Sequence, residues 1–222
     1  MTEAEWSASG EPASMVFALH DRRLRRKHLL FACACFQRTH AAHPDGIRAI
    51  GVLERYADGE ADFPEVVRLR AELGRPDGPT WPLFADGIGI TTDFWGSEFG
   101  QFHAAWQTAS AVTRVATSRK PGRPSRAATA ERERTRAQLK ALVRCVFGNP
   151  FHPVAFSPEW RTGTALALAR QMYEAREFIA MSILADALQD AGCDNDDILN
   201  HCRGEGPHVR GCWVVDLVLG KE

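Results

Sequence analysis

Cysteine and histidine side chains, which bind zinc and act as nucleophiles, gather near the end of this chain. Residues 191–220, AGCDNDDILNHCRGEGPHVRGCWVVDLVLG, hold three of the six cysteines and two of the eight histidines. His208 and Cys212 are four residues apart, so a helix would present both on one face. Cys193 or Cys202 would complete such a set of ligands. One interpretation is therefore a zinc site built from His208, Cys212, Cys202 and Cys193.

Other cysteine and histidine pairs fit a shared metal ion less well. His201 and Cys202 are adjacent, so their side chains diverge. Cys33 and Cys35 are two residues apart, which places them about 200° apart around a helix axis. The chain contains no CxxC pair, the usual signature of a structural zinc site.

A second interpretation, favoured on general grounds, is that the same residues are structural. Free cysteine behaves as a small buried hydrophobe, and a histidine can be satisfied by a neighbouring carbonyl group. A third interpretation is catalytic, because His208, Cys212 and Asp216 recur every four residues. One helix would then align an imidazole, a thiol and a carboxylate. That arrangement gives poor attack geometry, so an enzyme is the less favoured prediction.

The apolar run after Cys212 is predicted to anchor the C-terminus as a helix from Gly206–Pro207 to Gly220. Trp213 is expected to pack against the LADAL helix, and emptying its site should cost about 3–5 kcal/mol. Asp216 lies inside this apolar run, where an ionised carboxylate needs a partner. Arg203 or Arg210 is the expected partner of Asp216.

A basic stretch offers a different kind of site. RKPGRPSR resembles an AT-hook, in which a Gly-Arg-Pro core inserts arginine into the minor groove. Nine Lys or Arg against two Glu give residues 119–144 a net charge of +7. Weak, salt-dependent contact of Arg119, Lys120 and Arg123 with nucleic acid is therefore one prediction, and a solvated linker is the favoured alternative.

Composition and hydropathy set the broad class. The 222 residues are 45% hydrophobic and 25% charged, with a net charge of −1, which is typical of a soluble globular protein. No signal peptide precedes the chain's first helix, and no run is long and apolar enough to span a membrane. The protein is therefore expected in the cytoplasm, without membrane contact, where thiols stay reduced.

The periodicity of apolar residues predicts an all-α protein, an irregular multi-helix bundle with Gly- and Pro-rich connections. Helices are expected over 45–58, 63–73, 97–117, 127–147, 164–174, 178–190 and 196–202, and from Leu24 to Phe36. Three regions follow from this pattern. They are an N-terminal helical region (1–118), a basic linker (119–126) and a C-terminal helical region (127–222).

Several stretches resemble an uncharacterised family abundant in planctomycete bacteria. They are MTEAEW, LLFACAC and ERYADG in the first part, and VFGNPFHPV, LADALQDAGC and ILNHCRGEGPHVRGCWVVDLVLGKE in the last, together about two thirds of the chain. The family motif is HCRGxGPHVRGCWVVDLxLGK. The resemblance implies that Cys33, His201, Cys202, His208, Arg210, Cys212, Trp213 and Asp216 belong to the family's pattern. Similar members often carry a double cysteine where this chain has Cys35–Phe36.

The function that these observations favour is a helical interaction or structural module with an unidentified protein partner. The alternatives are a zinc-binding protein or enzyme that uses His208 and Cys212, and a weak nucleic-acid binder that uses the basic segment 119–144.

Overall fold

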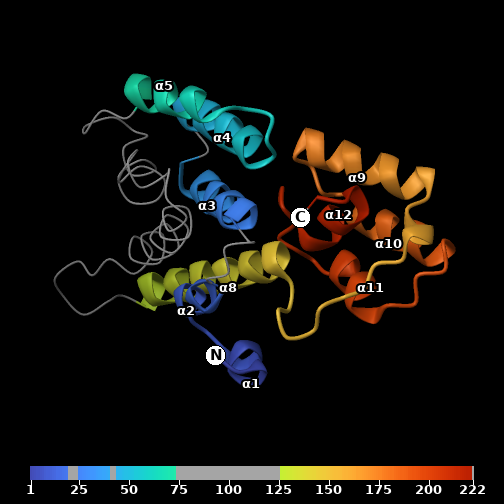
Figure 1. The fold of residues 1–222 in the computed structure, drawn as a ribbon. Coiled ribbons are helices and arrows are strands. Elements are labelled where there is room, and N and C mark those ends of the chain that lie inside the picture. The colour runs from blue at the N-terminus through green and yellow to red at the C-terminus, as the bar shows by residue number, and fades with distance from the viewer. Residues whose placement is uncertain (20–24, 41–43, 74–125, 222) are drawn as a thin grey trace. The chain divides into compact units, whose positions relative to one another are not determined.

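Every regular element that the structure describes is a helix. The structure is a computed structural model, and it describes residues 1–19, 25–40, 44–73 and 126–221 (Figure 1). No strand occurs in these ranges, so the prediction of an irregular all-α fold is confirmed. None of the helices in the same ranges is long and apolar enough to cross a membrane.

The chain divides into two compact units, Met1–Val143 and Arg144–Glu222. The division falls within α8 (Arg126–Phe147), a helix that runs from one unit into the other. The sequence pattern instead places a linker at 119–126, and residues 119–125 lie outside the described ranges.

The N-terminal unit is built from α1 (Glu3–Ala8), α2 (Pro12–Ala18), α3 (Arg25–His40), α4 (Pro44–Ala57), α5 (Phe63–Leu73) and most of α8. Thr2 forms a reciprocal capping box with Glu5 at the start of α1. α3 packs on α4 and α4 on α5, around buried apolar residues that include Cys33 and Phe36. This burial explains why these three helices of moderate length stay folded.

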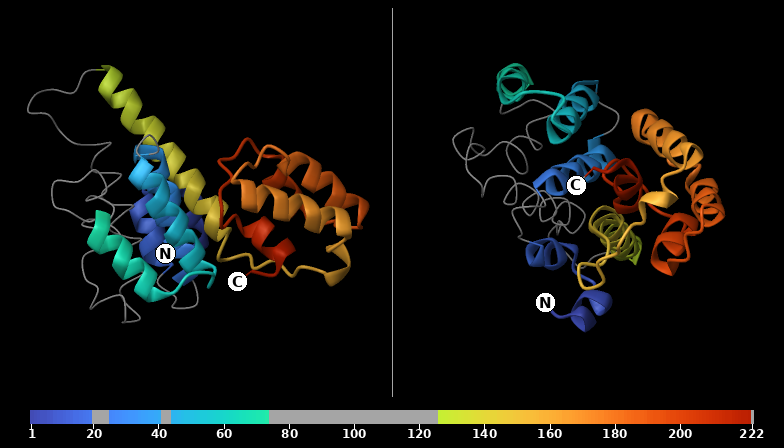
Figure 2. Two further views of the ribbon diagram at one scale, coloured as in Figure 1. Left: turned by 90° about the horizontal axis from the view of Figure 1, so that it is seen from above. Right: turned by 45° about the vertical axis from the view of Figure 1, so that its right-hand side comes forward.

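The C-terminal unit contains the last turn of α8, a 3-10 turn (Pro158–Trp160), α9 (Gly163–Ala175), α10 (Met181–Asp190), α11 (Asp196–Arg203) and α12 (Trp213–Leu219). Thr162 caps α9 and Asn195 caps α11, each accepting a hydrogen bond from a backbone N–H in the first turn. α10 packs on α9 and α11, and α12 lies between α9 and α11 (Figures 1 and 2). A single apolar core joins these helices.

The last helix is shorter than the sequence pattern predicts. It begins at Trp213 rather than at Gly206–Pro207, although it ends at Gly220 as expected. Gly206 and Gly211 have φ angles of +86° and +91°, which an α-helix excludes. The predicted stripe of His208, Cys212 and Asp216 along one helix is therefore wrong, because His208 lies in a loop.

The packing of the last helix also differs from expectation. α12 packs chiefly on α9, rather than on the LADAL segment of α10. Val214, Val215 and Val218 are fully buried, whereas Trp213 is half-buried. Arg161 donates two hydrogen bonds to the carbonyl oxygen of Leu217, with Nη2 at 2.9 Å, in addition to the bond that this oxygen accepts from the Gly220 N–H at the end of α12.

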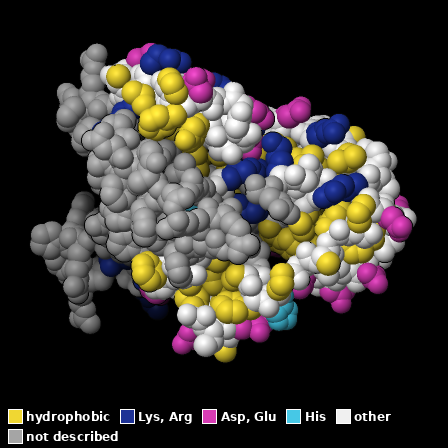
Figure 3. Space-filling view, in the orientation of Figure 1, with side chains coloured by type: hydrophobic (Ala, Val, Ile, Leu, Met, Phe, Trp, Pro, Cys, Tyr) yellow, Lys and Arg dark blue, Asp and Glu magenta, His cyan; other side chains and the backbone are white. Residues whose placement is uncertain are grey.

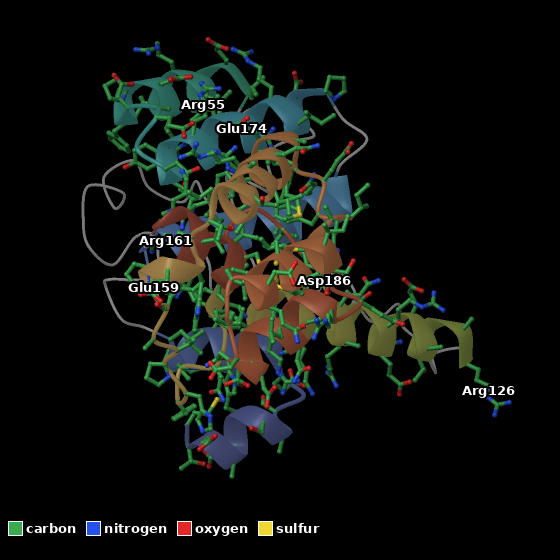
Figure 4. The ribbon with its side chains drawn as sticks, turned by 90° about the vertical axis from the view of Figure 1, so that its right-hand side faces the viewer. Arg55, Arg126, Glu159, Arg161, Glu174 and Asp186 are labelled. Atoms are coloured by element: carbon green, nitrogen blue, oxygen red, sulfur yellow. The ribbon has the colours of Figure 1, made fainter. Side chains whose placement is uncertain are left out.

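Charged side chains of both signs are spread over the described surface in Figure 3, which agrees with the small net charge. Glu159, Arg161 and Asp186, labelled in Figure 4, are exposed side chains of the C-terminal unit. The candidate site residues described next are instead buried or half-buried.

Candidate metal centre

Four side chains from four separate segments converge inside the C-terminal unit. Cys145 lies in the last turn of α8, and His201 lies in the last turn of α11. His208 belongs to the loop that follows, and Cys212 is the N-cap residue of α12. One potential ligand atom from each residue lies within 4.8 Å of all the others. Two thiols and two imidazoles are thus held together by the ends of three helices.

The loop between α11 and α12 turns the chain back so that His208 meets His201. A Cβ at Gly206 would lie 2.9 Å from the backbone nitrogen of His208 and 3.2 Å from its Cδ2 atom. Only glycine permits this close approach together with the positive φ angle. The imidazole rings of His201 and His208 consequently meet edge to face, with their centroids 4.9 Å apart.

Hydrogen bonding fixes the tautomer of His208. Its Nε2 atom lies 3.2 Å from the carbonyl oxygen of Gly204, which can only accept, so Nε2 carries the proton. In the neutral ring Nδ1 then has the lone pair, and this buried atom has no hydrogen-bond partner. A metal-binding histidine usually donates its other N–H to a carbonyl group in this way.

His201 points at the thiol of Cys212. Its Nε2 atom lies 3.2 Å from the Cys212 Sγ atom. The ring of Trp213 covers His201, with the two centroids 5.3 Å apart. Trp213 in turn packs against Gly148, where an added Cβ would lie 3.3 Å from the indole. The indole therefore holds His201 in place and separates it from the segment after α8.

The electrostatics of the group favour a thiolate at Cys212. Burial alone would raise the pKa of Cys212, but contacts with Cys145, His201 and His208 outweigh it and hold that pKa well below the usual range. Burial would lower the pKa of His208, yet its interactions with Cys212 and the Gly204 carbonyl raise it. Each effect stabilises a thiolate beside an imidazolium in the metal-free protein.

The structure brings together two of the four metal ligands predicted from the sequence. His208 and Cys212 belong to the group, joined by a loop rather than by a helix face. Cys193 and Cys202 lie outside it as buried thiols, and burial raises the pKa of both. Cys145 and His201 take the two remaining places. His201 and Cys202 do diverge, as adjacent residues on a helix must, and His201 faces the group.

Two predicted structural residues have contacts outside the converging group. Arg203 donates hydrogen bonds to Asp186 at 3.1 Å and to Gln189 at 2.6 Å. Arg210 stacks on the ring of Tyr173 at 4.4 Å. Asp216 is buried, and its pairing with an arginine stays a prediction. The proposed nucleic-acid contacts Arg119, Lys120 and Arg123 lie outside the described residues.

The four side chains supply the donor atoms of a tetrahedral zinc site, in a wider spacing than ligands of a bound ion have. Sulfur and nitrogen ligands bind zinc at about 2.3 Å and 2.0 Å, so atoms that share one ion lie roughly 3.3–3.8 Å apart. The group spans at most 4.8 Å, and a small contraction would close it around the ion. Two thiolates with two imidazoles are a donor set that selects zinc in a tetrahedral site.

Searches against protein-family models, curated proteins and solved structures find no match to this chain. The resemblance to the planctomycete family therefore stays a prediction.

Proposed function

We propose that the C-terminal unit is a zinc-binding module in which Cys145, His201, His208 and Cys212 hold one structural ion. The observation that supports it most strongly is the buried, unpartnered Nδ1 atom of His208, which lies in a group with two thiols and a second imidazole. A buried nitrogen without a partner destabilises the fold, and a bound cation removes that cost.

The proposed role of the ion is structural. Four protein ligands leave no open coordination position for water or substrate, which is the mark of structural zinc. The ligands come from the end of α8, the end of α11, the following loop and the start of α12. Zinc would therefore tie together four segments at one point of their shared core, and a structural ion favours a non-enzymatic protein.

Metal content of the purified full-length chain tests the proposal. We expect one zinc per chain by elemental analysis, lost in Cys145→Ser and in His208→Ala. Cys202→Ala is the matched control, because Cys202 is a buried thiol of the same unit that lies outside the group. Zinc retained by Cys145→Ser but lost in Cys202→Ala would contradict this ligand set and favour the one predicted from the sequence.

A helical interaction module remains the second proposal, and two exposed side chains favour it. Ile179 and Ile183 are 90% and 57% exposed, and they lie four residues apart, Ile179 in the turn before α10 and Ile183 in its first turn. Large apolar side chains so exposed are typical of contact surfaces. Zinc binding is compatible with this role, because a metal-stabilised unit can present such a surface. For both roles we propose a cytoplasmic location, where the thiols stay reduced.

A further inference from the structure

The two thiols of the metal centre form a pair that can be oxidised. Cys145 and Cys212 each contribute a sulfur atom to the group whose ligand atoms all lie within 4.8 Å. Neither thiol is in a disulfide, and each is positioned by a helix end rather than by a long flexible loop. A disulfide needs the sulfur atoms about 2.05 Å apart, so the two thiols have to approach each other when the bond forms.

We propose that Cys145 and Cys212 are a peroxide-sensitive pair, and that their oxidation to a disulfide releases the zinc ion. This inference rests on the proposed zinc site and assigns it a regulatory function. A hydroperoxide is the oxidant, and a reducing thiol restores the pair.

The chemistry balances with one peroxide molecule. One thiolate attacks a peroxide oxygen, so that an S–O bond forms, the O–O bond breaks, and the hydroxide that leaves takes a proton to become water. The second thiolate attacks the resulting sulfenic sulfur, so that the S–S bond forms, the S–O bond breaks, and the hydroxide that leaves takes a proton to become the second water. The two sulfurs lose two electrons, and the two ligands no longer carry negative charge for a metal to bind.

Burial decides which oxidant can react. Cys145 and Cys212 are 2% and 0% exposed, whereas His201 and His208 are half-buried. A small peroxide can reach the sulfurs through brief local opening on the histidine side. A thiolate this deeply buried cannot attack a bulky disulfide such as oxidised glutathione in line without wider unfolding, so the pair should discriminate between these two classes of oxidant.

Cys202 is the competing partner for Cys212. The two thiols are close enough for their charges to interact, and Cys193 is a further neighbour of Cys202. Neither Cys193 nor Cys202 belongs to the group of converging ligand atoms. We therefore expect the sulfur of Cys145, rather than that of Cys202, to capture the oxidised Cys212.

Tryptic peptide mapping distinguishes these pairings, because cleavage separates the cysteines of interest. Cys145 falls in peptide 145–161, Cys212 in 211–221, and both Cys193 and Cys202 in 177–203. After hydrogen peroxide treatment of the zinc-loaded full chain, we expect peptide 145–161 joined to 211–221, with a mass lower by two hydrogens. A chromogenic chelator should report one zinc released per disulfide, and dithiothreitol with added zinc should reverse both changes.

The controls separate this inference from the proposed function. Cys202→Ala should release zinc and form the same linked peptide as the wild type. Linkage of 211–221 to 177–203, over-oxidation of Cys212 with Cys145 still reduced, or zinc retained at millimolar peroxide would each overturn the proposal. If the purified chain neither holds nor takes up zinc, the proposed function fails, while peroxide treatment of that metal-free chain still shows whether Cys145 and Cys212 pair.

Discussion

Two segments of this protein contain nearly the same chemistry and place it differently. HLLFACAC in α3 and HCRGEGPHVRGC between α11 and α12 each combine histidine with two cysteines. The first lies within one continuous helix, Arg25–His40, where Cys33 and Cys35 must point in different directions. The second is broken by glycines, so that the side chains of a helix end, a loop and a helix start converge.

The pKa values of the thiols express the same contrast. Burial raises the pKa of Cys35, and the charge of Arg38 offsets only part of that effect. Cys212 is equally buried, but Cys145 and two imidazoles hold its pKa well below the usual range. Residue composition alone therefore does not make a reactive or metal-binding thiol. The pKa of a buried thiol is lowered where the chain turns back and brings polar side chains beside the sulfur atom.

The largest effect that we expect separates the two segments directly. Cys212→Ser should abolish zinc binding and lower the free energy of unfolding of the C-terminal unit by several kcal/mol, since metal binding contributes to folding. Cys33→Ser changes the same residue type in α3 and should leave one zinc per chain. Elemental analysis with thermal unfolding measures both. Zinc loss in Cys33→Ser would remove the distinction between the segments.

Trp213→Ala should have the next largest effect. The half-buried indole packs against Gly148 and covers His201, so its removal leaves a cavity beside a proposed ligand. We expect a loss of about 2–4 kcal/mol in unfolding free energy, less than full burial would give. Zinc affinity should also fall, measured by competition with a fluorescent chelator. Unchanged affinity in a destabilised protein would make Trp213 part of the packing alone.

Gly206→Ala tests whether the loop geometry makes the site. The added methyl group would lie against the backbone of His208, at a φ angle that alanine rarely adopts. We expect zinc affinity to fall roughly 10- to 100-fold, the usual effect of disturbing the support of a ligand. Gly163→Ala is the control, because its Cβ would enter open space in α9. Equal zinc affinities in the two variants would show that the loop can change its backbone conformation without disturbing the site.

The sequence predicts helices far better than it predicts the site. α5 begins and ends at Phe63 and Leu73 as expected, because its apolar period and the following glycine are local signals. The same use of apolar periodicity gives a wrong result for the loop from Gly204 to Cys212. The apolar run after Cys212 predicts a longer helix that includes this loop, but the helix begins at Trp213. A glycine can lie at the start of a helix or in a turn, and the neighbouring residues do not distinguish these two conformations at Gly206.

The sequence analysis did not predict Cys145 and His201 as ligands, and the physical reason is different. Cys145 lies far upstream, in a helix whose apolar face also accounts for a buried cysteine. No neighbouring residue in the sequence indicates that Cys145 is a ligand, because the other three residues come close to it only in the folded structure. His201 offers a usable signal. Since adjacent residues on a helix diverge, either His201 or Cys202 had to face the site, and the histidine is the costlier side chain to bury without a partner.

The smallest expected effect concerns pH. The raised pKa of His208 gives stability that is present below its ordinary value near 6.5 and is lost as pH rises through the raised value. The lowered pKa of Cys212 gives stability that is present above the ordinary thiol range and is lost as pH falls through the lowered value. Between pH 6.5 and the raised pKa of His208, the two contributions change in opposite directions and largely cancel.

His208 and Cys212 should therefore make the unfolding temperature of the metal-free protein nearly independent of pH across that window. Zinc must displace the proton of His208, so zinc affinity should rise roughly tenfold per pH unit for each proton displaced. Chelator competition and thermal unfolding, with and without zinc, measure the two slopes. Cys35→Ala should keep both, because the raised pKa of the α3 thiol leaves it protonated throughout. An unfolding temperature of the metal-free protein that changes steeply with pH would show that His208 and Cys212 do not titrate as a pair. A pH dependence that differs in Cys35→Ala would count against them in the same way.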